Sequence, residues 1–347
     1  MNVGIIAFSE RGHALGQGLA QALQGKGHSA QAERCGEGGL AAWTQARFAS
    51  KDALVFIGSA GIAVRAVAPH VRSKAADPAV VVVDDLGKYS ISLLSGHLGG
   101  ANDLAVEIAA LVGAAPVITT ATDLRGIFAV DTWAKSQGLA IANPGRIKRV
   151  SARLLAGEAL ALSSGFPIQG APPQGIRLIQ GPGDIAVSWE RRPLAAQDPA
   201  APEPLHLVPP AITLGVGCKK GTDAQAIESA FARLLESAGC HPLAVARVCS
   251  IDLKARETGL VEFCRRHGLP LSTFSARELA AVPGAFTASA FVQSVTGVDN
   301  VCERSAILGG GPGARLLAQK HAAGGVTMAL ALGPYPLRFP EGGEEEP

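Results

Sequence analysis

Short apolar runs alternate with amphipathic stretches along most of the chain. Runs such as "NVGIIAF" (2–8), "ALVFIGS" (53–59) and "AVVVVDD" (79–85) have the length and composition of strands buried on both faces. Helical patterns such as "ALGQGLAQALQGKG" (14–27) and "ANDLAVEIAALVGA" (101–114) separate these runs. Because strand and helix patterns alternate, we expect an α/β fold with a mainly parallel sheet and helices on both faces.

A second α/β pattern begins near residue 208, after a stretch rich in proline. It starts with the strand pattern "AITLGVGC" (211–218), followed by a helix that Thr222 and Gln225 are expected to open as a capping box. Further on, "CERSAILGGGPGARLLAQKH" (302–321) is expected to pass through a glycine loop into another helix. We therefore expect two α/β units, joined by a small middle region and a proline-rich linker. The expected boundaries are 1–130, 131–207, 208–336 and an acidic tail at 337–347.

The totals exclude several classes of protein. A formal net charge of +2, with no cationic run longer than two residues, argues against a nucleic-acid surface. No apolar run approaches the roughly 20 residues that span a bilayer. The beginning of the chain lacks the basic start and cleavage region of a signal peptide, so we expect a cytoplasmic protein.

The cysteines and glycine loops do not predict a metal or a nucleotide. The six cysteines form no CxxC pair, and neither Cys nor His clusters at zinc-ligand spacing, so no metal site is expected. The glycines of "ILGGGPGARL" (307–316) depart from G-x-G-x-x-G, which makes a dinucleotide site a weak alternative. Cysteine nucleophiles and a serine triad also lack the partners that they need.

Glycine and polar residues gather at four predicted strand ends. The segments are "GSAG" (58–61), "DD" (84–85) leading to "SGHLGG" (95–100), "TTATD" (119–123) and "GVGCKKGTD" (215–223). Each could simply form a turn or cap a helix. Ligands of doubly wound sheets, however, sit beyond the carboxyl ends of parallel strands, and four such segments together favour a site.

His97 is the strongest catalytic candidate, because near-neutral imidazole suits proton transfer. Glycines on both sides would let a ligand approach the backbone, although a packing or capping role stays open. Asp84 or Asp85 is expected to orient or assist His97. The amides around Gly99 and Gly100 are candidate oxyanion donors. Farther along the chain, Glu303 could be a base and Arg304 a carboxylate clamp, with an internal salt bridge as the alternative.

Six segments of the chain resemble one known family. "GSAGIAVRAVAPHV", "DPAVVVVDDLGKYSISLLSGHLGGANDLA" and "PVITTATD" resemble the N-terminal core of the cobalt-precorrin-5A hydrolases, the CbiG family of anaerobic cobalamin biosynthesis. "LGVGCKKGTDAQAIESAF", "SIDLKARETGLVEFCRRHGLPLSTFSARELAAV" and "GVDNVCERSAIL" are similar to its C-terminal domain. The stretch over about 131–205 matches poorly, and we assign no function to it.

The resemblance implies a reaction in which water opens the δ-lactone of cobalt-precorrin-5A. Acetaldehyde then leaves and cobalt-precorrin-5B forms. The substrate carries both the cobalt and many carboxylates, so we expect no cofactor. The expected partner is a cobalt corrinoid, without nucleic acid or membrane, and a homodimer is left open. Residues expected to bind the substrate are Gly58, Ser59, Gly61, Arg65, Lys88, Ser95, Gly96, Gly99, Gly100, Asn102, Thr120, Asp123, Arg125, Gly217, Lys219, Lys220 and Arg304.

Two other classes of function stay open at this point. One is a tetrapyrrole carrier without catalytic activity, because the C-terminal part resembles a module that can occur separately. The other is a dinucleotide-dependent α/β enzyme, against which the broken glycine pattern argues. Release of acetaldehyde from added substrate separates the hydrolase from the carrier, and cofactor titration tests the dinucleotide enzyme.

Overall fold

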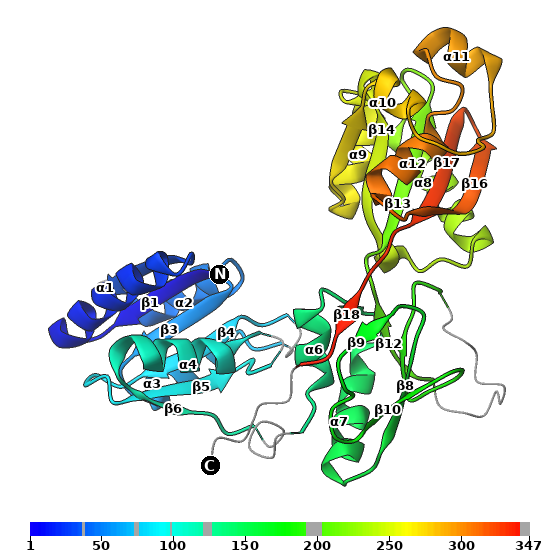
Figure 1. Cartoon of the computed structure of the whole chain (residues 1–347). Coiled ribbons are helices and arrows are strands. Elements are labelled where there is room, and N and C mark those ends of the chain that lie inside the picture. The colour runs from blue at the N-terminus through cyan, green and yellow to red at the C-terminus, as the bar shows by residue number, and fades with distance from the viewer. Residues whose placement is uncertain (37–38, 73–75, 98, 121–126, 192–202, 341–347) are drawn as a thin grey trace. The chain divides into compact units, whose positions relative to one another are not determined.

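The structure is a computed structural model that describes residues 1–36, 39–72, 76–97, 99–120, 127–191 and 203–340 (Figure 1). The chain divides into two units, Met1–Thr132 and Trp133–Pro347, and each is described by itself. All sheets are mixed or parallel and are covered by helices or by further strands, which confirms the expected α/β class.

The first unit is built around one six-stranded sheet. Its strands, in order across the sheet, are β2 (Ser29–Arg34), β1 (Asn2–Ala7), β3 (Ala53–Ile57), β4 (Ala79–Val83), β5 (Tyr89–Leu94) and β6 (Ala115–Val117). Strands β1 to β4 are parallel, and every residue of β3 and β4 is buried. Continuous apolar runs are what such strands require, because helices cover both of their faces.

Two layers of helices complete this unit. The helices are α1 (Glu10–Gly25), α2 (Gly39–Phe48), α3 (Ala60–Val67) and α4 (Ala101–Val112). Leucines of α1 and α4 share a core cluster with one face of the sheet, whereas α2 and α3 share a cluster with the other face. A further helix, α6 (Val130–Ser136), begins at the end of this unit.

Strand β5 runs against the direction of β4. The register pairs Val83 with Ser90 and Val80 with Leu94, and β6 then runs parallel to β5. Only five residues connect β4 to β5, and a parallel crossover needs a dozen or more. As a result, the segment after β5 emerges at the edge of the sheet where β1, β3 and β4 begin.

The second unit starts with the region that the sequence left without a fold. Its five-stranded sheet has the order β10 (Ile176–Ile179), β8 (Leu160–Ser164), β11 (Ile185–Val187), β12 (Leu205–Val208) and β7 (Ala140–Ile141). Helix α7 (Ile147–Leu155), preceded by a 3-10 turn at Pro144–Arg146, supplies Ile147, Val150 and Leu154 to the core. Strand β12 is fully buried, so 205–208 belong to this sheet and the prediction of a linker there was wrong.

The chain returns to this region near its end. β18 (Leu337–Arg338) pairs with β9 (Ile168–Gln169), and the side chains of Leu337 and Phe339 are buried. Phe339 stacks on Trp133, whose indole N–H donates to the Arg338 carbonyl. Residues 337–339 are therefore part of a core and not of a solvated tail, because their apolar side chains have partners here.

The C-terminal sheet has the order β15 (Leu271–Phe274), β14 (Val245–Ile251), β13 (Ile212–Cys218), β17 (Val326–Leu332) and β16 (Arg315–Ala323). Strands β13, β14 and β15 are parallel, and β17 and β16 are antiparallel. The α-helices are α8 (Ala224–Ser237), α9 (Thr258–His267), α10 (Ala276–Ala280), α11 (Ala290–Thr296) and α12 (Cys302–Gly310). Short 3-10 turns lie at Pro242–Ala244 and Asp252–Lys254.

Two local predictions in this sheet were wrong. Residues 315–323 form strand β16 and not a helix, because the Gly324–Gly325 turn folds them back onto β17. Pairing in the sheet here overrides the helix propensity of an alanine- and leucine-rich segment. The N-cap of α8 is Asp223, which accepts from the Ala226 amide at 2.6 Å, so Thr222 and Gln225 form no capping box.

Candidate functional site

The first group of predicted residues lies where β3 and β4 end. Gly58 and Ser59 lead from β3 into α3, and Asp84 and Asp85 follow β4. The Asp84 carboxylate accepts hydrogen bonds from the amides of Leu86, Lys88 and Tyr89, at 3.1, 2.7 and 2.6 Å. Asp84 therefore shapes the turn between β4 and β5.

The other residues of this edge also have local partners. Asp85 accepts a hydrogen bond from Ser9, the N-cap of α1. Arg65 donates to the Gly61 carbonyl at 3.1 Å, one turn earlier in α3. At Gly58 a Cβ atom would lie 2.8 Å from the Phe8 ring, so close packing accounts for this glycine. This edge brings together Gly58, Ser59, Gly61, Arg65, Asp84, Asp85 and Lys88.

His97 lies at the opposite edge of the sheet. The antiparallel direction of β5 carries Ser95–Gly100 to the edge where β3 and β4 begin, away from Asp84 and Asp85. The predicted pairing of His97 with Asp84 or Asp85 was therefore wrong. It treated residues 84–100 as one segment at a single strand end and missed β5, which lies between Asp85 and Ser95.

The carboxylate that faces His97 is Asp131, in the first turn of α6. His97 Nδ1 and Asp131 Oδ1 are 3.7 Å apart, with 18% of the histidine side chain and 4% of the aspartate side chain exposed. A carboxylate beside Nδ1 favours the tautomer in which Nε2 can accept a proton. Sequence reasoning missed Asp131; its only signal was one acidic residue among apolar neighbours in "AVDTWA".

The glycines around His97 are explained by the packing of the loop itself. A Cβ atom at Gly99 would lie 2.6 Å from the Ser95 carbonyl oxygen, and one at Gly96 would lie 2.6 Å from Asn102 Oδ1. The Gly100 amide donates to the His97 carbonyl at 2.9 Å, so it is not available as an oxyanion donor in this conformation.

Ser95 is the one non-glycine residue with a positive φ, 58°, among the residues that the structure describes. Such strained backbone is common at functional sites, although it does not identify one. The Ser95 hydroxyl is buried and has no hydrogen-bond partner in the described part of the chain.

Asn102 joins three segments at the same edge. Its Oδ1 accepts from the Ser92 hydroxyl at 2.6 Å, and its Nδ2 donates to Thr120 Oγ1 at 2.9 Å. The structure thus brings Ser95, Gly96, His97, Gly99, Gly100, Asn102 and Thr120 together. Asp123 and Arg125 lie outside the described residues.

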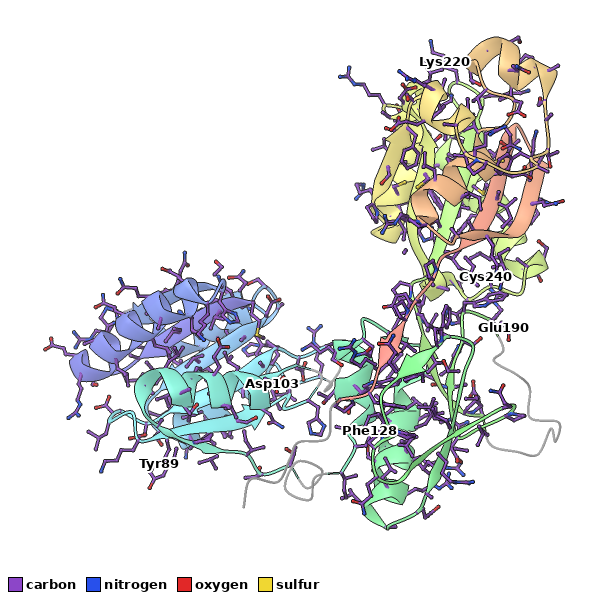
Figure 2. All side chains as sticks on the ribbon, viewed as in Figure 1. Tyr89, Asp103, Phe128, Glu190, Lys220 and Cys240 are labelled. Atoms are coloured by element: carbon purple, nitrogen blue, oxygen red, sulfur yellow. The ribbon has the colours of Figure 1, made fainter. Side chains whose placement is uncertain are left out.

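A large cavity opens at the carboxyl ends of β13 and β14 in the C-terminal sheet. Its volume is about 1070 Å³, and Gly217, Lys219 and Lys220, all predicted from the sequence, line it. Figure 2 shows Lys220 at this end of the C-terminal sheet. Three more cations line the same cavity, namely Lys254, Arg256 and Lys320. None of these three was selected from the sequence, because Lys254 and Arg256 lie at the 3-10 turn after β14 and Lys320 lies within β16, far apart in the chain.

Glu303 and Arg304 are not in this cavity. Glu303 has no exposed surface, and its two oxygens accept from the amide and hydroxyl of Thr287, from Asn300 Nδ2 and from the Lys320 amide. A base must reach its substrate, so the role predicted for Glu303 was wrong. Arg304 pairs with Asp299 at 2.8 Å and stacks on Phe286, which confirms the internal salt bridge and leaves no free clamp.

The cysteines carry no sign of activation. All six are free thiols. Burial raises the pKa of Cys218, which lines the cavity, and raises that of Cys302 to about 11. The thiolate, which is the reactive form, is therefore disfavoured.

Among the described residues, no three His, Cys, Asp or Glu side chains gather as a metal site would require. Nor does any helix within the described ranges have the length and apolar character needed to cross a membrane.

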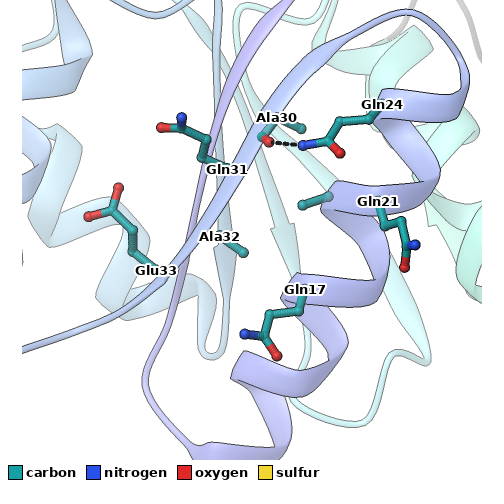
Figure 3. Close-up of a pocket in the computed structure, with 8 residues that line it drawn as sticks. Gln17, Gln21, Gln24, Ala30, Gln31, Ala32 and Glu33 are labelled. Atoms are coloured by element: carbon teal, nitrogen blue, oxygen red, sulfur yellow. Dashed lines mark hydrogen bonds between the residues drawn. The ribbon is translucent and has the colours of Figure 1, made fainter.

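A second hollow, of about 610 Å³, lies between α1 and the edge strand β2 (Figure 3). Glutamines 17, 21 and 24 line its helical side, and Gln24 donates to the Ala30 carbonyl. Its one ionisable lining residue among those described, Glu33, is already paired with Arg47. The described lining of this hollow therefore offers no pair of ionisable groups comparable to His97 and Asp131.

These features define a multidomain α/β protein with a histidine–aspartate pair in one unit and a cationic cavity in the other. Comparison with known proteins identifies the family. Residues 42–123 match the family described as "Cobalamin synthesis G N-terminal", 128–207 its central region and 212–331 its C-terminus. The chain belongs to this family, which confirms the resemblance and extends it to the middle region.

Curated relatives match over most of the chain. It is 36% identical to "Cobalt-precorrin-5A hydrolase" of Salmonella typhimurium (strain LT2), over 85% of this chain and 86% of that protein. It is 33% identical to the protein of the same name from Priestia megaterium, over 83% and 80% of the two chains. A solved structure of a putative cobalamin biosynthesis protein G homolog from Sulfolobus solfataricus has a TM-score of 0.41 at 23% identity and covers 95% of this chain and 97% of that one.

Proposed function

We propose that this protein is a cobalt-precorrin-5A hydrolase. It opens the δ-lactone of its substrate with water and releases acetaldehyde, which gives cobalt-precorrin-5B in cobalamin biosynthesis. The observation that carries this proposal is the 36% identity, over 85% of the chain, to a relative named for that activity. The site must then supply a base for water and later a base for the hydroxyl group that the opened lactone leaves.

His97 is the proposed base in both steps. It takes a proton from water as the water oxygen attacks the lactone carbonyl. It returns this proton to the ring oxygen as the lactone opens, which leaves a hydroxyl group, a carboxylic acid that ionises, and a neutral imidazole. It then takes the hydroxyl proton, the carbon–carbon bond breaks, and the macrocycle accepts the electron pair while acetaldehyde leaves. Asp131, 3.7 Å from Nδ1, orients the ring and stabilises the imidazolium ion that forms.

The substrate carboxylates are the proposed ligands of the cationic residues. Lys219 and Lys220 line the cavity of the C-terminal sheet, whereas Arg65 and Lys88 lie at the edge opposite His97 in the first sheet. Arg304 is withdrawn from this set because Asp299 holds it. No resident cofactor is part of the proposal, because the cobalt belongs to the substrate and the macrocycle accepts the electrons.

Replacement of His97 tests the proposal. His97→Ala and His97→Gln should each lower the rate of acetaldehyde release by about 10² to 10⁴, the usual contribution of a general base. Asp131→Asn should lower kcat less, because the base itself remains. His70→Ala is the matched control in the same unit, where the ring packs on Phe48, and it should keep its turnover.

Melting temperatures measured on the same preparations separate catalysis from folding. A His97→Ala protein that melts early but turns over normally per folded molecule would refute the assignment of the base. A wild-type protein that releases no acetaldehyde from cobalt-precorrin-5A would refute the function itself.

A further inference from the structure

We infer that the cavity at the end of the C-terminal sheet binds the corrin ring of the substrate. The ring lies against helix α11, and the carboxylates of the substrate lie against the five cationic side chains that line the cavity. The inference rests on the proposed function and deepens it. It assigns binding of the macrocycle to a place in the chain separate from the proposed base, His97.

Large apolar side chains are unusually exposed to solvent in this cavity. Phe291, Leu253 and Val295 are 72%, 64% and 61% exposed, and they are the three most exposed large apolar side chains in the described ranges. All three line the cavity. Phe291 and Val295 lie one helical turn apart on α11, so they present a continuous apolar strip. Exposed apolar surface gathered in one place is typical of a binding site.

The charge of the cavity complements a polycarboxylate. Lys219, Lys220, Lys254, Arg256 and Lys320 line it, against the single carboxylate of Glu257. Glu257 is already engaged, since it accepts from Lys254 at 2.8 Å and from the Gly221 amide at 2.7 Å. Among the described residues the other four cations make no salt bridge. A surplus of positive charge thus gathers here in a chain whose formal net charge is only +2.

The size and construction of the cavity suit a large rigid ligand. Its volume of about 1070 Å³ lies at the upper end of the range for small-molecule pockets, which runs to about 1,000 Å³. The wall that carries α11 is also preformed. Asn300 and Glu303, which follow α11, hold the segment that precedes α11 through part-buried hydrogen bonds to Thr287. A ligand would therefore not have to order this wall on binding.

Two cobalt corrins serve as probes of the full-length protein. Cobyrinic acid has free carboxylates, whereas in cobinamide the carboxylates are converted to amides, so the pair separates ring contacts from charge. Binding is followed by the change in the visible absorption of the ring. The wild type should bind cobyrinic acid more tightly than cobinamide.

Exposed positions allow variants that do not disturb the fold. Phe291→Ser with Val295→Ser should weaken the binding of both corrins about tenfold or more, because the apolar strip is lost. Lys220→Glu with Arg256→Glu should weaken the binding of cobyrinic acid by at least a similar factor and change that of cobinamide little. Val261→Ser and Arg233→Glu are matched controls, since both side chains are exposed and neither lines the cavity.

The outcomes separate this inference from the proposed function. Cavity variants that bind both corrins as the wild type does would overturn it, even if the wild type releases acetaldehyde. A wild type that binds cobyrinic acid through these residues but releases no acetaldehyde would support the inference and refute the proposed function. His97→Ala should bind cobyrinic acid as tightly as the wild type does.

Discussion

Replacement of Glu303 distinguishes a structural carboxylate from a catalytic one. The side chain has no exposed surface and accepts four hydrogen bonds, at 2.6 to 2.9 Å. Two of the donors belong to Thr287 and the others to Asn300 and Lys320, so Glu303 joins the segment that precedes α11 to the start of α12 and to β16. We expect Glu303→Ala to destabilise the C-terminal sheet strongly.

The structure indicates the size of the effect. Thr287 is exposed, so its amide and hydroxyl can reach water, whereas Asn300 is buried and Lys320 is half-buried, so the donors of these two residues are the ones left without a partner. Each buried donor without a partner costs about 1–3 kcal/mol, so two of them predict a loss of about 4 kcal/mol in the free energy of unfolding. In a unit of this size that loss corresponds to a drop of about 10 °C in melting temperature. Glu303→Gln keeps one acceptor oxygen and should lose about half as much.

Urea and thermal unfolding of the full chain, together with turnover per folded molecule, test this reasoning. Glu228→Gln is the matched control, because its carboxylate pairs with His267 at the surface and its loss should change stability by less than about 1 kcal/mol. Unchanged melting of both Glu303 variants, with turnover lost per folded molecule, would show that Glu303 acts in the reaction and that the structural account is wrong.

Three further predictions follow from single features. Gly99→Ala should lower the free energy of unfolding of the first unit by about 1–3 kcal/mol in urea titrations, because the added Cβ would meet Ser95. Gly18→Ala is the control, since open space surrounds Gly18, and it should not lower this free energy. Equal stability of the two variants would contradict the packing argument. Burial lowers the pKa of His206, so on acidification the unfolded chain takes up a proton before the folded chain does, and the free energy of unfolding should fall as the pH drops below about 6.5. His206→Gln should therefore show a smaller drop in melting temperature between pH 7.5 and 5.5 than the wild type. An unchanged drop would exclude this histidine as the cause. Acetaldehyde release should survive EDTA, since the described residues hold no metal cluster; loss of activity that zinc restores would refute a metal-free protein.

The central strands were predictable because their physical signal is strong. "ALVFI" and "AVVVV" have no polar residue, and only a strand covered on both faces needs that pattern. Strand β5 was not predicted, because its residues fall within the segment that leads from Asp85 to Ser95. One clue was available, since the short connection between β4 and β5 is compatible only with an antiparallel neighbour. Without that clue, His97 was assigned to the wrong edge and to the wrong carboxylates.

The C-terminal cavity could be predicted only in part. "GVGCKKGTD" follows a clear strand, so Lys219 and Lys220 stood out, and both line the cavity. Lys320 could not be found, because the alanine-rich segment around it has the composition of a helix and becomes a strand only through its pairing with β17. Phe291 and Val295 have the spacing of core residues on a helix, and only the structure shows that they are exposed.

The proposed reaction makes two demands that differ in kind, and the chain meets them with different residues. Binding a large anionic ring needs apolar contact area and positive charge. Under the further inference, helix α11 supplies the contact area and the cations around Lys220 supply the charge. Moving a proton needs an acid–base group, and under the proposed function that group is His97, with Asp131 beside its Nδ1. Interactions made equally with substrate and transition state change KM, whereas those made only in the transition state change kcat. Charge reversal at Lys220 should therefore raise KM with little change in kcat, and His97→Ala should lower kcat with little change in KM. Steady-state kinetics of acetaldehyde release measure both constants, and a Lys220 variant that loses kcat alone would show that the two demands are not divided in this way.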